Sequence, residues 1–220
     1  QSFSKNKSNF QSSFGENVAA EGLYYVASFN TNESAYGDFG DYKELGYLAL
    51  ANYSYKDKYV LDLSFRNDGS SRFASGYRFG NFYSVGAAWN ISNENFLTDS
   101  DIVDDLKLRA SFGQTGNNGI GNNQYQSLFG YGGAYDNNGA VAPSTFGNLI
   151  ISWETAELLD VGVDFSLFDG RLSGGVTYYE KTTEDLLQSV PLSRTTGHTS
   201  QTMNIGSILN KGIEVEIDAQ

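Results

Sequence analysis

The side chains best suited to binding a ligand lie in one long, glycine-rich segment, residues 114–152. This segment interleaves glycine with aromatic rings, a carboxylate and amides. A flat apolar ring beside hydrogen-bonding groups suits stacking on a sugar or gripping a peptide, although the same rings could equally pack the loop against its neighbours. The candidate substrate-binding residues are Tyr125, Phe129, Tyr131, Tyr135, Asp136 and Asn137.

Four other constellations have simpler explanations. Residues 68–72 (DGSSR) could form an anion-binding nest, but no helix follows them, so a structured loop is favoured. Residues 116–121 have glycines like those of a dinucleotide loop, yet a poor helix start follows. The acidic residues within 38–44 and 99–105 lack the spacing of a calcium loop, which favours solvated charge. His198 is most simply a surface residue.

Composition excludes several classes of function. Lys and Arg number 14 against 26 Asp and Glu, a net charge of −12, which excludes nucleic acid as a main partner. There is no cysteine and one histidine, so no thiolate chemistry, histidine metal pair or catalytic triad can be assembled. We therefore expect no enzyme, no cofactor and no metal site.

Apolar residues recur at every second position through most of the chain, the period of a strand with one apolar face. In residues 59–66 Tyr59, Leu61, Leu63 and Phe65 alternate with mostly polar residues. Mean hydropathy is −0.38 and no run approaches the roughly 18 apolar residues of a membrane helix. Strands of a membrane β-barrel have such averages, because lipid-facing and lumen-facing residues alternate.

The expected connections are of two kinds. Tight turns are predicted at residues 56–58, 169–170 and 210–212, and the Asp-Gly pair favours a type I′ turn. Residues 67–81, 114–152 and 180–201 are long and polar, so these loops share the other end of the sheet. Residues 1–44 are predicted to be a further long extracellular loop region, and residues 45–220 barrel strands. Short turns on one rim and long loops on the other are typical of outer-membrane barrels.

Several segments resemble the SusC/RagA family of TonB-dependent outer-membrane transporters. From residue 45 onward, their order and spacing resemble the second half of that family's barrel. The departures are mild: Phe112 stands where Tyr is usual, and Gly147-Asn148-Leu149 lacks an expected Pro. The segments that carry the resemblance are YVLDLSFRNDGSSRF (59–73), AAWNISNE (87–94), LKLRASFGQTGN (106–117), NIGS (204–207) and NKGIE (210–214).

The resemblance implies an all-β protein, an antiparallel transmembrane β-barrel segment with about eight strands of a barrel of about 22. It also implies a plug in the lumen, TonB-driven import of an oligomeric nutrient (glycan or peptide), a SusD-like surface lipoprotein and the outer membrane of a Gram-negative bacterium. These 220 residues include neither the plug nor the segment that engages TonB. We therefore expect a fragment of a longer protein, with TonB reached through an absent N-terminal region.

Two alternatives remain open at this point. A passive porin or small closed outer-membrane barrel predicts a chain complete at about this length. A secreted β-sandwich that binds a ligand would also show alternating strands and aromatic loops. Its apolar face would be an interior of large branched residues, whereas Ala87, Ala110 and Gly174 lie on that face here.

Overall fold

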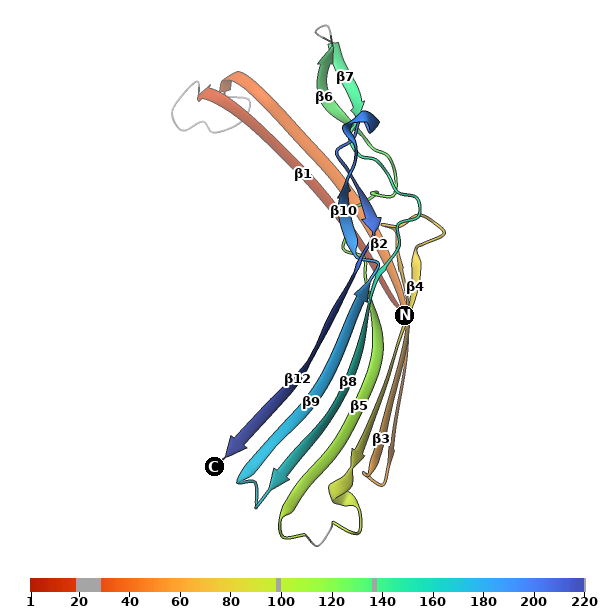
Figure 1. Ribbon diagram of the computed structural model, residues 1–220. Coiled ribbons are helices and arrows are strands. Elements are labelled where there is room, and N and C mark those ends of the chain that lie inside the picture. The colour runs from red at the N-terminus through yellow and green to blue at the C-terminus, as the bar shows by residue number, and fades with distance from the viewer. Residues whose placement is uncertain (19–28, 98–99, 136–137, 220) are drawn as a thin grey trace.

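Eight antiparallel strands form one curved sheet in the computed structural model (Figure 1). The structure describes residues 1–18, 29–97, 100–135 and 138–219, and only their backbone within 13–38 and 131–139. The order across the sheet is β1-β2-β3-β4-β5-β8-β9-β12, so each strand pairs with the next in the chain except where two small hairpins intervene. The strands are β1 (Ser2–Val18), β2 (Phe29–Tyr55), β3 (Tyr59–Ser70), β4 (Phe79–Asn90), β5 (Val103–Asn117), β8 (Glu154–Leu167), β9 (Leu172–Glu184) and β12 (Ser207–Ala219).

The remaining elements are short and lie in the connections. Strands β6 (Phe129–Tyr135) and β7 (Asn138–Pro143) form one hairpin, and β10 (Leu187–Pro191) and β11 (Ser200–Asn204) form another. The described connections also hold two 3₁₀ turns, η2 (Ile91–Asn93) and η3 (Arg194–Thr196). No helix in the described ranges has the length and hydrophobicity to cross a membrane.

Register aligns the alternating residues of seven strands into two continuous faces. Side chains of directly paired residues lie on the same face of a sheet, and alternate residues of each strand share that face. One row of the apolar face runs Tyr53, Leu61, Ala87, Ala110, Val161, Tyr178 and Ile213. The adjacent row of the polar face runs Asn52, Asp62, Gly86, Ser111, Asp160, Tyr179 and Gly212.

The apolar face is uncovered by any other described part of the chain. Leu61, Val163 and Ile213 are 38%, 36% and 69% exposed. The buried apolar residues of the described chain lie at one end of the sheet instead: Phe73, Ile120 and Ile151 form a cluster in the loops, and Phe82 lies on β4 nearby. A β-sandwich would bury this face under a second sheet. A single layer with a wide exposed apolar face suits contact with lipid.

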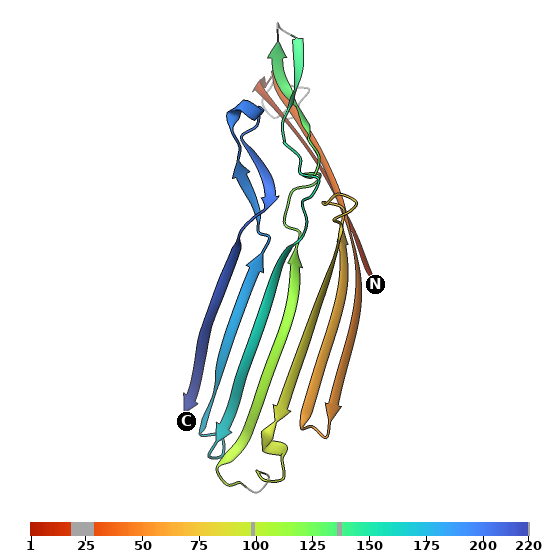
Figure 2. The ribbon, with the colours of Figure 1, turned by 45° about the vertical axis from the view of Figure 1, so that its right-hand side comes forward.

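The two ends of the sheet differ as the sequence predicts (Figure 2). At the turn rim, short connections join β2 to β3 and β8 to β9, and a somewhat longer one joins β4 to β5. At the loop rim lie residues 71–78, 118–135, 138–153 and 185–206, including both small hairpins. The predicted left-handed turn is confirmed, since φ is 56° at Asp169 and 77° at Gly170. The antiparallel sheet with two chemically distinct faces is therefore confirmed.

The loop predicted over residues 1–44 is wrong for the part the structure describes. Residues 2–18 are β1 and residues 29–44 belong to β2, and the two strands pair along their length. Their polar, glycine-containing sequence lacks a clean apolar alternation because much of this hairpin extends past the other strands (Figure 1). At about 3.3 Å per residue, the 27 residues of β2 are roughly 90 Å long, far more than a membrane crossing needs.

The tight turn predicted at residues 210–212 is also wrong. β12 continues through these residues, and each pairs with β9. Gly212 fits against an aromatic ring rather than turning the chain, since a Cβ there would lie 2.9 Å from the Tyr179 hydroxyl oxygen. The bend comes earlier, at Gly206, where φ is +86°.

Candidate functional site

The polar face of the sheet carries an ionic network that joins three strands. Arg109 of β5 places Nη1 2.6 Å from Asp160 Oδ1 and Nε 3.1 Å from Asp164 Oδ2, both on β8. Its Nη2 donates to Thr177 Oγ1 of β9 at 2.6 Å. Gly162 leaves room for the guanidinium, since a Cβ there would lie 2.9 Å from Arg109 Cζ. A charged network that is partly exposed suits a wet lumen and not a hydrocarbon environment.

Three aromatic rings connect the sheet to the loops above it. The Trp153 ring centroid lies 5.4 Å from that of Phe82 on β4 and 5.4 Å from that of Phe73 in the loop after β3. Trp153 Nε1 also donates to the carbonyl of Arg78 at 3.0 Å. Phe73 is fully buried and Phe82 is 5% exposed. These three rings, called the aromatic column below, fix the loop after β3 against the sheet, because they have little free space to move into.

Arg72 joins three segments that are distant in sequence. Its guanidinium lies 3.9 Å from the ring centroid of Tyr42 on β2, a cation–π contact. Its Nε donates to Asn122 Oδ1 at 3.3 Å and its Nη1 to the carbonyl of Asn118 at 3.2 Å. The Asn118 amide in turn donates to Glu44 Oε1 at 2.8 Å. The arginine therefore holds the loop after β5 against β2.

A second set of contacts joins the two longest connections. Gln201 Nε2 donates to the carbonyl of Gly147 at 2.7 Å, and Asn148 Nδ2 donates to the carbonyl of Thr202 at 3.0 Å. Asn204 pairs with the backbone of Ser152 in both directions, at 2.8 and 2.9 Å. Amides bound to backbone fix irregular loops well. The two connections thus form one body.

The predicted substrate-binding residues divide into three groups. Tyr125 packs against the cluster of Phe73, Ile120 and Ile151, and its hydroxyl accepts a hydrogen bond from Gln126 Nε2 at 2.9 Å. Phe129 lies at the start of β6 and is 63% exposed. The backbones of Tyr131 and Tyr135 lie in β6, while Asp136 and Asn137 lie outside the described residues.

The loop rim also holds a pocket that the sequence does not indicate. Its volume is about 420 Å³, and it lies between the segment after β7 and the β10–β11 hairpin. The rings of Phe146 and His198 lie 5.2 Å apart on its wall, at an interplanar angle of 30°. Residues 143–146 and 197–202 meet only through tertiary packing, so no spacing in the sequence signals the pocket.

The segment considered as an anion-binding nest forms backbone contacts instead. In residues 68–72 the backbone N–H of Ser70 donates to the carbonyl of Arg78 and that of Ser71 to the carbonyl of Lys43, both at 3.0 Å. These donors are therefore unavailable to an anion. The predicted loop is wrong for residues 68–70, which are the end of β3, and holds only for Ser71 and Arg72. Within the described ranges, no three His, Asp or Glu side chains group closely enough to hold a metal ion.

The turn rim is held by one carboxylate. Glu94 accepts hydrogen bonds from Lys58 Nζ at 2.9 Å, Tyr59 Oη at 2.7 Å and Trp89 Nε1 at 3.2 Å. The hydrogen bonds from Lys58 and then Tyr59 lower the pKa of Glu94 to about 2. The connection after β4 is thereby tied to the turn between β2 and β3.

A curved antiparallel sheet with an exposed apolar face, a charged face and its loops gathered at one rim defines a segment of a transmembrane β-barrel. The family described as TonB dependent receptor-like, beta-barrel matches residues 2–220. The chain belongs to this family.

Named relatives refine the resemblance. TonB-dependent receptor P39 of Formosa agariphila is 42% identical over 172 residues, which cover 78% of this chain and 17% of the relative. TonB-dependent receptor SusC of Bacteroides thetaiotaomicron is 37% identical over 188 residues, covering 80% and 18%. The chain therefore spans less than a fifth of the length of these two relatives. The resemblance to the SusC/RagA family is confirmed.

Solved structures agree with this assignment. The structure of the RagAB peptide transporter superposes with a TM-score of 0.90 at 30% identity, covering 99% of this chain and 24% of that chain. The siderophore receptor PirA from Pseudomonas aeruginosa has a TM-score of 0.54 at 16% identity and shares the fold alone. The fold class predicted from the sequence, a segment of a larger barrel, is confirmed.

Proposed function

We propose that this chain is part of the wall and outer loops of a TonB-dependent importer in the outer membrane of a Gram-negative bacterium. The observation that carries the proposal is the continuous apolar band across seven paired strands, opposite a face that holds the Arg109 network. In this orientation the turn rim faces the periplasm and the loop rim faces the medium. The protein is not an enzyme.

The proposed cargo is an oligomeric nutrient, a glycan or a peptide, which the loop rim captures together with a SusD-like surface lipoprotein. The likeness to SusC and to the RagAB peptide transporter supports this assignment. Coupling to TonB is assigned to the regions of these relatives that the present chain does not cover. The outer-membrane lipid surrounds the apolar face.

Substrate contact is proposed in the connection between β5 and β8, through Tyr125, Phe129, Tyr131, Tyr135, Asp136 and Asn137. The exposed ring of Phe129 supports this placement. An exposed ring in water can meet the apolar face of a sugar or the side chain of a peptide.

Transport is tested with the full-length protein in cells. Uptake of labelled oligosaccharides and peptides is compared between a strain with TonB and one without it. The proposal expects uptake of one of the two classes to require both the protein and TonB. Uptake that persists without TonB would identify a passive pore instead.

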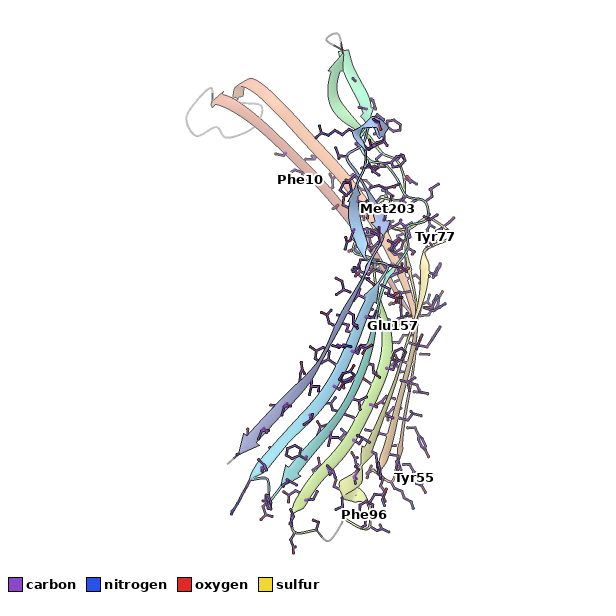
Figure 3. All side chains as sticks on the ribbon, in the orientation of Figure 1. Phe10, Tyr55, Tyr77, Phe96, Glu157 and Met203 are labelled. Carbon is purple, nitrogen blue, oxygen red and sulfur yellow. The ribbon has the colours of Figure 1, made fainter. Side chains whose placement is uncertain are left out.

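The binding site is tested by Phe129→Ala in the same protein, with Phe96→Ala as the matched control. Both phenylalanines are well exposed, but Phe96 lies at the opposite, turn rim (Figure 3). Phe129→Ala is expected to weaken substrate binding measured by calorimetry about fivefold or more, since a stacked ring contributes about 1 kcal/mol or more. Equal affinities for the two variants would remove Phe129 from the site.

A further inference from the structure

The apolar face of the sheet is hollowed near the turn rim. Ala87 of β4 and Ala110 of β5 are paired neighbours, and their small side chains form the floor of a groove of about 350 Å³. Larger side chains form its walls: Tyr53, Tyr59, Leu61, Trp89 and Leu108. The volume lies in the usual range of small-molecule pockets, about 300–1,000 Å³.

Most side-chain polar groups around this groove are engaged elsewhere. Tyr59 Oη and Trp89 Nε1 both donate to Glu94, while the two rings line the groove. The rings are stacked, with centroids 6.2 Å apart and 17° between their planes. Arg109 also borders the groove, but its guanidinium is bound to Asp160 on the opposite face of the sheet. The groove therefore offers hydrocarbon contact and almost no hydrogen bonding.

A cation lies beside the groove at the turn rim. Lys56 Nζ lies 5.3 Å from the ring centroid of Tyr55, and Tyr55 pairs with Tyr59 of the groove wall. Lys58, the other cation of this turn, is bound to Glu94. In the part of the chain that the structure describes, Lys56 forms no ion pair. Its ammonium is therefore free to meet a phosphate.

We propose that this groove binds an acyl chain of an anionic phospholipid whose phosphate is held by Lys56. The inference rests on the proposed function, which places the apolar face in lipid and the turn rim at the periplasmic leaflet. A lipid supplies both required chemistries at the required places, an apolar chain on Ala87 and Ala110 and a negative charge at the rim.

A second copy of this chain fits the groove less well. Copies related by a twofold axis present the same patch to each other. With the axis through the groove, hollow would face hollow across Ala87 and Ala110, and the two Lys56 ammonium groups would approach each other without a counter-charge. Neither feature stabilises an interface, because voids and like charges both oppose association. A flexible acyl chain fills such a hollow without these costs.

The test uses the full-length protein in nanodiscs that contain equal amounts of phosphatidylglycerol and phosphatidylethanolamine. After transfer to detergent, retained lipids are identified by native mass spectrometry. Ala110→Phe fills the groove with an apolar ring, and Ala51→Phe makes the same change on the same face outside the groove. Lys56→Gln removes the cation. Heat-modifiable mobility first establishes that each variant is folded and inserted.

The wild type and Ala51→Phe are expected to retain phosphatidylglycerol in preference to phosphatidylethanolamine. Ala110→Phe should retain at least tenfold less of either lipid, and Lys56→Gln should lose the preference between them. Equal retention by all inserted variants would overturn the inference, as would a dimer that dissociates only in Ala110→Phe. A wild-type protein that never inserts would instead overturn the proposed function. If Ala110→Phe does not insert, Ala87→Leu is used instead, because it places a smaller apolar side chain on the floor of the same groove.

Discussion

Replacing Gly116 by alanine places a methyl group where the ring of Phe82 lies. The added Cβ would lie 2.0 Å from Phe82 Cζ and 2.5 Å from Cε1. The ring cannot swing freely, because it is 5% exposed and its edge packs on Trp153. Movement toward Gly80 is also blocked, since even a Cβ at that position would lie 2.6 Å from Phe82 Cζ. The missing side chain of Gly116 thus leaves the space, called the notch below, that the ring of Phe82 occupies.

The expected loss follows from two opposing effects. Overpacking of a closed site costs about 1–3 kcal/mol. Alanine also gains roughly 0.5–1 kcal/mol over glycine in an extended strand through lower chain entropy. Gly116→Ala should therefore lower the free energy of unfolding by roughly 0–2.5 kcal/mol, and by about 1–3 kcal/mol relative to a glycine-to-alanine change in an open strand site. Gly86→Ala is the matched control: its Cβ would lie 3.7 Å from Asp62 Cβ, an ordinary contact, and it should be neutral or stabilising.

The measurement is urea unfolding of the full-length protein from lipid vesicles. A third variant, Phe82→Leu, shortens the ring, and combining it with Gly116→Ala should recover about 1 kcal/mol relative to additivity. Equal stability of Gly116→Ala and Gly86→Ala, with additive effects in the double variant, would refute the notch. The aromatic column would then have more freedom than its packing indicates.

Two further predictions concern charged groups. Because hydrogen bonds, first from Lys58, lower the pKa of Glu94 to about 2, this carboxylate stabilises the protein above its ordinary pKa of 4.5, and the contribution is lost as pH falls toward 2. The difference in unfolding midpoint between wild type and Glu94→Gln should therefore shrink over this interval, and a constant difference would contradict the assignment. Arg109→Met should cost about 1–2 kcal/mol because Asp160 and Asp164 lose their shared partner. Adding Asp160→Asn should recover part of that loss in the same unfolding assay, and strict additivity would mean that the pair is not coupled.

The strands were predictable because one physical requirement repeats along each of them. A face that meets lipid and a face that meets water impose a period of two, as at Leu61 and Asp62, and this period survives without any knowledge of tertiary structure. The turn at Asp169-Gly170 was predictable for an equally local reason, since left-handed backbone favours these residues.

The two errors in the fold come from signals that have more than one cause. Asn210, Lys211 and Gly212 are typical turn residues, but Gly212 is small because Tyr179 lies across from it on β9. Residues 2–18 and 29–44 form a long hairpin whose polar composition is that of a loop. Extension beyond the membrane removes the apolar alternation on which strand prediction depends.

The architecture of the loop rim could not be predicted for a different reason. Arg72 meets Tyr42 and Asn122, which lie 30 and 50 positions away in sequence. Similarly, His198 meets Phe146 across two separate connections. Such contacts depend on how the strands bring loops together, and no local period or spacing encodes them. The aromatic residues of the candidate site were recognisable by type, but the packing of Tyr125 was one of two open interpretations.

The central claim is that one face of the sheet meets hydrocarbon and the other meets water. Adjacent residues of β3 test it most directly, by comparing Leu63→Arg with Asp62→Arg in the full-length protein folded into lipid vesicles. Leu63 lies on the apolar face further from the turn rim than Leu61, so Leu63→Arg should cost about 2–4 kcal/mol of unfolding free energy. Asp62→Arg should cost much less, about 1 kcal/mol, for the lost hydrogen bond from Asn52. Equal losses at the two positions, or a larger loss at Asp62, would contradict the assignment of the faces.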